Sequence, residues 1–126
     1  MSYEFDFTDV FAAWPELLQA LVDTLMLSAS AMVLGLVVSI LGALGRTSGP
    51  RWLRWIITEY IELIRNTPLL IQIFVVFFGL PALGLKLSSN VAALLALVVN
   101  VAAYGIEIIR AGIESIHKGQ IEAGKA

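Results

Sequence analysis

The residues best suited to chemistry lie in or beside the last long apolar stretch of the chain, Val91 to Ile109. Asn100, Tyr104 and Glu107 are spaced four and then three apart, and Arg110 adjoins the same helical face. An ionisable residue within a membrane is costly, so it usually has a partner or a function. An amide, a phenol and a carboxylate on one stripe can hold a zwitterion or a cation. Equally, Glu107 and Arg110 can pair at the membrane boundary.

A second polar group lies in the middle of the chain, where Glu62, Arg65 and Gln72 share one arc of a helix and Glu59 lies at its border. Glu62 and Arg65 are three apart and can pair. One interpretation is an ion pair that fixes helix packing or meets a neighbouring subunit. The other is a polar lining of a substrate path. The predicted path residues are Asn66, Thr67, Gln72, Asn100, Tyr104 and Glu107, and the predicted structural ion pairs involve Glu62, Arg65 and Arg110.

Other kinds of site are poorly supported by the sequence. The chain has no cysteine and a single histidine, His117, which excludes disulfides, thiol nucleophiles and multi-histidine metal sites. Gly42, Gly45 and Gly49 are not followed by the GK[ST] of a phosphate-binding loop. The serines of the first apolar stretch have no histidine beside them. We therefore expect no catalytic residue, metal or cofactor, and the net charge of −2 gives no indication of a nucleic-acid partner.

The elements that carry these residues are predicted to be membrane helices. The chain is 59% hydrophobic and 14% charged, with a mean hydropathy of +0.87, whereas soluble domains have about a quarter of their residues charged. Its charges are missing from long stretches, as in a chain dissolved in lipid. We expect an all-α integral membrane helical bundle with three transmembrane helices, at about residues 22–45, 54–80 and 90–112.

Two features predict how these helices pack. In the first span, small residues recur on one face and allow close approach of another helix; they are Ser28, Ala31, Gly35, Ser39 and Gly42. In the second, only residues 69–80 are strongly apolar, and Pro68 removes a backbone hydrogen bond, which should kink the helix there. Pro81 and Gly84 are expected to end it.

The basic residues predict the orientation. Arg46, Arg51 and Arg54 lie between the first two spans, and further basic residues follow the third, at positions 110, 118 and 125. Cytoplasmic loops are enriched in Lys and Arg, so the N-terminus is expected outside. Residues 1–19 then form an outer segment with a short stretch at the interface. This segment is acidic and lacks the basic start of a cleaved signal peptide.

Three motifs resemble one family of membrane proteins. The run from Glu59 to Gln72 resembles a signature of ABC permeases for polar amino acids, the histidine, glutamine, arginine and opine group. The pattern from Asn100 to Ile113 is similar to the third span of that family, and residues 118–123 resemble the start of its EAA loop. The three occur in the order and at the separations that the family has.

The resemblance implies five spans in a complete permease and a bacterial cytoplasmic (inner) membrane location. It implies a second permease subunit, in a homo- or heterodimer, two ABC ATPase subunits that hold the ATP, and an external solute-binding protein that delivers an amino acid. Residues 20–126 would form the N-terminal part of the transmembrane domain, breaking off in the EAA coupling loop at residues 119–126. The implied ATPase-coupling residues are Gly119, Gln120, Glu122, Ala123 and Gly124, although the family commonly has Ala at the last of these positions.

The leading hypothesis is therefore a permease subunit of an ATP-driven importer that works by alternating access in the lipid bilayer. Such a subunit is not an enzyme, because ATP is hydrolysed on its partner. The alternative is a small membrane scaffold or channel component without nucleotide dependence, built on the same small-residue stripe and inward polar groups. An intramembrane enzyme is the third and least supported hypothesis.

Overall fold

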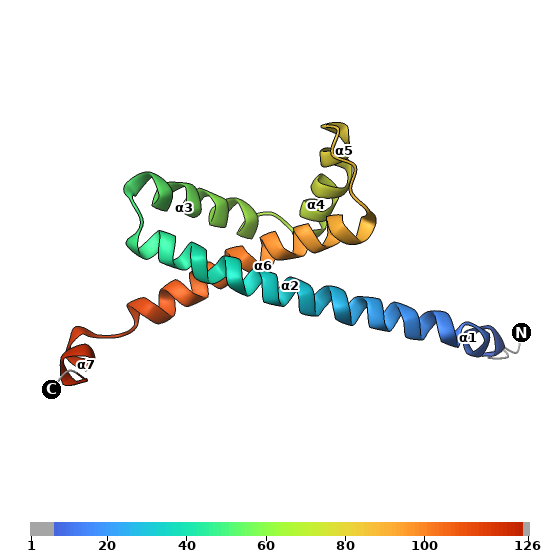
Figure 1. Cartoon of the computed structure of the whole chain (residues 1–126), viewed down its shortest axis with the longest axis horizontal. Coiled ribbons are helices and arrows are strands. Elements are labelled where there is room, and N and C mark those ends of the chain that lie inside the picture. The colour runs from blue at the N-terminus through green and yellow to red at the C-terminus, as the bar shows by residue number, and fades with distance from the viewer. Residues whose placement is uncertain (1–6, 125–126) are drawn as a thin grey trace, which may run out of the picture.

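The computed structural model describes residues 7–124, and within that range the regular structure is entirely helical. Helix α1 (Thr8–Ala12) leads into α2 (Trp14–Ser48), followed by α3 (Arg51–Arg65) and α4 (Leu69–Phe74). The π-helix η1 (Val75–Gly79) and α5 (Leu80–Ala82) continue α4, and α6 (Ser89–Glu114) and α7 (Lys118–Ala123) complete the chain. Figure 1 shows α2 and α6 running in the same direction and crossing, with the α3–α5 arm on one side of them. The predicted all-α membrane bundle is confirmed.

The long helix α2 begins at Trp14, with Pro15 in its first turn, where a missing N–H costs nothing. The predicted boundary at residue 19 therefore falls inside α2. At 1.5 Å per residue, its 35 residues reach about 50 Å, beyond the roughly 30 Å of a hydrocarbon core. The helix ends at Ser48, before Gly49 and Pro50.

Helices α2 and α6 are both long and apolar enough to cross a membrane. Their contact uses the small residues predicted from the sequence: Ala31, Gly35 and Ser39 are buried, and Ala43 extends the row. Gly42 is half-buried and Ser28 is exposed. A Cβ added to Gly35 would lie 2.6 Å from Cγ1 of Val101 in α6, so the backbones meet too closely for a larger side chain.

The third candidate span is broken. Helices α3 and α4–α5 are bent by 107° at residues 66–68, so they count as one span only if the bent pair is taken together. The predicted kink at Pro68 is present, and the bend is sharper than a kink within one continuous helix. After α4, the five residues of η1 form a π-helix, whose hydrogen bonds span five residues instead of four. The sequence did not predict this π-helix. Helix α5 ends at Ala82, and Gly84 has a φ of +89°, as expected for a glycine that terminates a helix.

Candidate functional site

The break between α3 and α4 is held together by one glutamine. Gln72 is 7% exposed, and its Nε2 donates to the carbonyl oxygens of Ile64 (2.9 Å) and Thr67 (2.8 Å). These carbonyls lose their helical partners where Pro68 interrupts the chain, and a buried carbonyl without a partner is costly. The hydroxyl of Thr67 also donates to the carbonyl of Leu63 at 2.7 Å. Gln72 thus satisfies the backbone that the bend exposes.

The same glutamine joins the broken arm to α6. Nδ2 of Asn100 donates to Oε1 of Gln72 at 3.2 Å. The sequence assigned both residues to a substrate path, and the structure brings them into contact across two helices. Each already has a protein partner, so a substrate would meet a formed hydrogen-bond network rather than free amides.

Arg65 and Tyr104 meet on the exposed side of this junction. Cζ of Arg65 lies 5.7 Å from the ring centroid of Tyr104, within the range of a cation–π contact. The predicted pairing of Glu62 with Arg65 is not formed, because neither residue belongs to any ion pair in the described part of the chain. Arg65 instead reaches across to α6, which is a contact that helical spacing within α3 cannot reveal. Asn66, also predicted for the path, is exposed at the bend.

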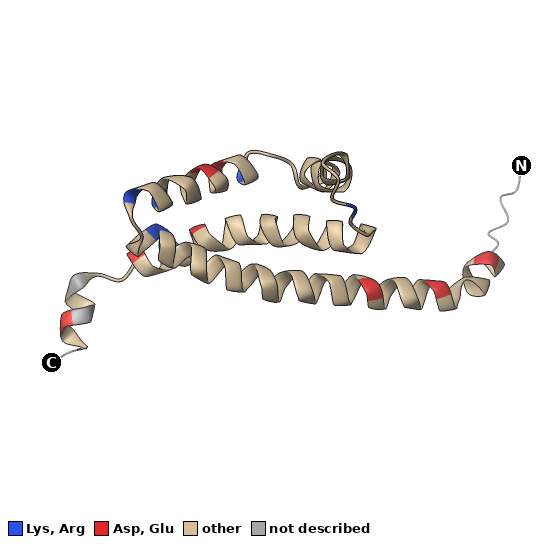
Figure 2. Ribbon diagram, turned by 45° about the horizontal axis from the view of Figure 1, so that its top comes forward, with Lys and Arg blue, Asp and Glu red and all other residues tan. Residues whose placement is uncertain are grey.

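Glu107 lies at the centre of an ion cluster where α2 and α6 end. Its Oε1 is 2.5 Å from Nη2 of Arg110, as the spacing allows, and its Oε2 pairs with Arg46 of α2. Nη1 of Arg110 is in turn 2.5 Å from Oε2 of Glu114. Figure 2 shows these blue and red segments gathered where the two helix ends lie side by side. The sequence missed Arg46 as a partner because it is 61 residues away from Glu107.

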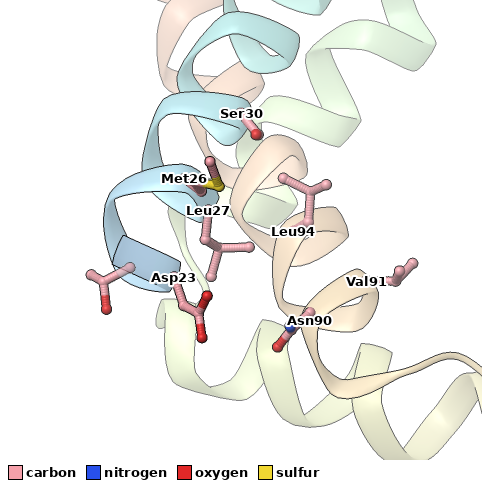
Figure 3. Close-up of a pocket in the computed structure, with 8 residues that line it drawn as sticks. Asp23, Met26, Leu27, Ser30, Asn90, Val91 and Leu94 are labelled. Atoms are coloured by element: carbon pink, nitrogen blue, oxygen red, sulfur yellow. The ribbon is translucent and has the colours of Figure 1, made fainter. Parts of the chain in front are cut away.

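Two cavities lie between the helices, one at the polar junction and one away from it. One, of about 220 Å³, lies under the bend between α3, α4 and α6, and its walls are almost wholly apolar apart from Thr67 and Gln72. The other, of about 460 Å³, lies between α2 and α6 near their N-terminal ends. Figure 3 shows Asp23 and Asn90 facing it from the two helices, with Met26, Leu27 and Leu94 as apolar walls. Sequence reasoning did not single out Asp23 or Asn90, whose proximity depends on the crossing of α2 and α6.

The segment predicted to couple to an ATPase forms the short helix α7. Backbone N–H of His117, its N-cap residue, donates to Oε1 of Gln120 at 3.2 Å, and the backbone N–H of Gln120 donates back to the carbonyl of His117. Gly119, Gln120, Glu122, Ala123 and Gly124 are all exposed. Residues 125–126, the end of the predicted loop, lie outside the described residues. These five residues therefore form an exposed surface near the end of the chain that Figure 1 marks C.

No group of three or more potential metal-ligating side chains occurs among residues 7–124. The arrangement comprises an ordered polar junction at a helix break, an ion cluster at the helix ends, and an exposed short helix. Broken helices of this kind are found where membrane transporters form binding sites, because irregular backbone is tolerated there only beside protein or a cavity.

The chain is similar in sequence to known proteins. Residues 31–126 match the family described as "Binding-protein-dependent transport system inner membrane component". The L-cystine transport system permease protein TcyB of Bacillus subtilis (strain 168) is 41% identical over 111 residues, which cover 88% of this chain and 47% of that protein. The arginine transport system permease protein ArtQ of the same organism is 41% identical over 122 residues, or 96% of this chain and 56% of that protein.

The fold of this chain is also similar to that of a solved structure. The crystal structure of an amino acid ABC transporter with histidines matches with a TM-score of 0.88 and 34% sequence identity, over 98% of this chain and 57% of the matched chain. The chain spans about half the length of the curated relatives it matches.

Proposed function

The chain belongs to the family of binding-protein-dependent transport system inner membrane components, and we propose that it forms part of the permease subunit of an ATP-driven ABC importer for polar amino acids. The observation that carries this proposal is the TM-score of 0.88, at 34% identity and over 98% of the chain, to an amino acid ABC transporter. The permease relatives named for cystine and arginine support the substrate class. Neither a scaffold nor a channel component accounts for these likenesses.

In this proposal the protein lies in the bacterial cytoplasmic membrane with its N-terminus outside. The outer segment, residues 1–19, includes the first turns of α2, which extend past the hydrocarbon core because the helix is longer than that core. Residues 20–126 contribute to the transmembrane domain. Arg46, Arg51 and Arg54 then face the cytoplasm, in accord with the excess of basic residues in cytoplasmic loops.

The substrate path would follow the broken helix. Asn66, Thr67, Gln72, Asn100 and Tyr104 gather around the bend, where the chain leaves regular helix. Glu107 lies at the cytoplasmic end of this path, and a substrate would meet it as one member of a balanced cluster with Arg46 and Arg110. The path opens alternately to either side as the helices tilt, and the permease breaks no covalent bond.

The partners are a second permease subunit, two ABC ATPase subunits that hold and hydrolyse ATP, and an external solute-binding protein. The permease itself needs no cofactor. Helix α7 would dock on the ATPase through Gly119, Gln120, Glu122, Ala123 and Gly124, since these residues are exposed and follow directly from the end of α6.

The test is uptake of labelled polar amino acids by vesicles that hold the permease containing this sequence, its ATPase and its binding protein. We expect uptake that requires ATP, and uptake that persists without ATP would contradict the proposal. Glu122→Lys should uncouple ATP hydrolysis from uptake, because it reverses the charge of the docking helix. Glu16→Lys is the matched control, since it makes the same charge change at an exposed position in the first turn of α2, far along the chain from α7.

A further inference from the structure

The ion cluster at the ends of α2 and α6 connects two helices that no other ion pair of the described residues joins. Arg46 supplies the only side chain from α2, and Glu107, Arg110 and Glu114 all belong to α6. Their side chains are 20% to 26% exposed, except Glu114 at 56%. The cluster has two positive and two negative charges, so its members stabilise one another without a net charge.

The cluster lies immediately before residues 115–117, which connect α6 to α7, and hydrogen bonds order the helix ends on both sides. The backbone N–H of Ser115 donates to the carbonyl of Ala111 at 3.0 Å, and its hydroxyl donates to Gly112 at 2.8 Å. Beyond it, the capping box of His117 and Gln120 fixes the first turn of α7. These bonds lie within the two helices on either side of residues 115–117, so a movement of α7 reaches the end of α6 through the covalent chain.

We propose that Arg46 is a positioning residue for coupling: through Glu107 it ties α2 to the end of α6, so that a movement passed from the docking helix α7 to the end of α6 also reaches α2. This inference rests on the proposed function. Without Arg46, movement of α7 would still reach α6, but the ends of α2 and α6 would lose the ion pair that joins them. ATP would then be hydrolysed with less transport.

Arg51 and Arg54 provide a natural comparison within the same region. Both lie in the first turn of α3, a few residues beyond Arg46, and both are exposed. Neither belongs to an ion pair in the described part of the chain. They share with Arg46 the charge that orients the protein in the membrane, but they lack its contact with α6. Replacing them therefore separates the contribution of basic charge from that of the contact.

The experiment compares Arg46→Gln, Arg46→Lys, Arg51→Gln and Arg54→Gln in the complete permease–ATPase complex reconstituted in vesicles. For each variant, ATP hydrolysis and amino acid uptake are measured together, along with the melting temperature of the complex. We expect uptake per ATP hydrolysed to fall about fivefold or more in Arg46→Gln, the smallest change typical of coupled sites. Arg46→Lys should keep most of the normal ratio of uptake to ATP hydrolysis, and Arg51→Gln and Arg54→Gln should match the unsubstituted complex.

Two results would overturn the inference. One is an unchanged ratio of uptake to ATP hydrolysis in Arg46→Gln. The other is a parallel loss of uptake, hydrolysis and melting temperature in both Arg46 variants, because that pattern assigns Arg46 an ordinary structural role. The proposed function fails separately, if the unsubstituted complex takes up no amino acid with ATP.

Discussion

The α2–α6 pair and the α3–α5 arm are held in place by different kinds of contact. In the pair, straight helices meet through glycine, alanine and serine, and the row includes Gly35, Ser39 and Gly105. In the arm, the helix is broken and bent by 107°; Gln72 donates to two carbonyls of the bend and accepts from Asn100 of α6, and Tyr60 donates to Val99 of α6. The pair is therefore held mainly by close backbone approach, with one ion pair at its end, whereas the arm combines the buried Ile61 with side-chain hydrogen bonds. The two should respond differently to substitution, and each difference can be measured.

The largest loss of stability is expected at the close contact between α2 and α6. Gly105→Val should destabilise the protein by about 3 kcal/mol, because even a Cβ there would lie 2.7 Å from Cβ of Ser39 in buried surroundings. The measurement is equilibrium unfolding of the purified protein in detergent micelles. Gly112→Val is the control, since a Cβ at Gly112 meets nothing within 4 Å in the same helix. Equal stability of the two variants would show that the close approach of α2 and α6 is unimportant.

The next effect tests the polar junction of the arm. Gln72→Leu keeps the side chain's approximate size but leaves the carbonyls of Ile64 and Thr67 and the amide of Asn100 without this partner. We expect a loss of about 2 kcal/mol of unfolding free energy. In Gln19→Leu the lost bond is to exposed Asp23, so stability should change little. If Gln19→Leu costs as much as Gln72→Leu, the junction does not hold the bend.

A smaller effect is expected in the ion cluster. Glu107→Gln removes the negative charge between Arg46 and Arg110 and should cost about 1.5 kcal/mol, between the values for buried and for exposed pairs. Glu114→Gln, with a side chain 56% exposed and one partner, should cost less than half as much. Unfolding in low and high salt measures both. The difference should shrink in high salt, and a difference that grows would contradict the assignment.

The smallest effect is expected at two tyrosines: Tyr60, which reaches from α3 to α6, and Tyr104, which belongs to α6. Tyr60→Phe loses the hydrogen bond from the phenol to the carbonyl of Val99, 2.5 Å away, and should cost about 0.6 kcal/mol, as is typical for hydrogen bonds within membranes. Tyr104→Phe removes a hydroxyl for which no hydrogen bond is found among the described residues, and it keeps the ring beneath Arg65. Its stability should therefore be unchanged. A larger loss for Tyr104→Phe than for Tyr60→Phe would reverse this assignment.

The part of the fold that depends on sequence-local chemistry could be predicted. The spacing of Ala31, Gly35 and Ser39 predicted a close helix contact, and Pro68 predicted an interruption, because small residues and proline act on the backbone where they stand. The bend's angle and the π-helix η1 could not be predicted. The bend depends on how Gln72 and α6 satisfy and cover the interrupted backbone, whereas no contact among the described residues explains the π-helix.

The sequence predicted many residues of the candidate site but fewer of the contacts between them. Asn100 and Gln72 were both singled out, but their mutual contact requires the arm to fold against α6. Helical spacing correctly placed Glu107 beside Arg110 and suggested Glu62 beside Arg65, although Arg65 contacts Tyr104 instead. Spacing gives the pairs that are possible within one helix. It carries no information about competing partners such as Arg46, which arrive from another helix.

The buried surface of α2 and α6 consists largely of residues without side-chain rotamers, namely Ala31, Gly35, Ala43, Ala92, Ala96, Ala102 and Ala103. Packing such residues sacrifices almost no side-chain conformational entropy. It also leaves the interface with few alternative rotamers through which it could reorganise. Any movement of α2 relative to α6 must therefore displace the helix backbones rather than rearrange side chains at the contact.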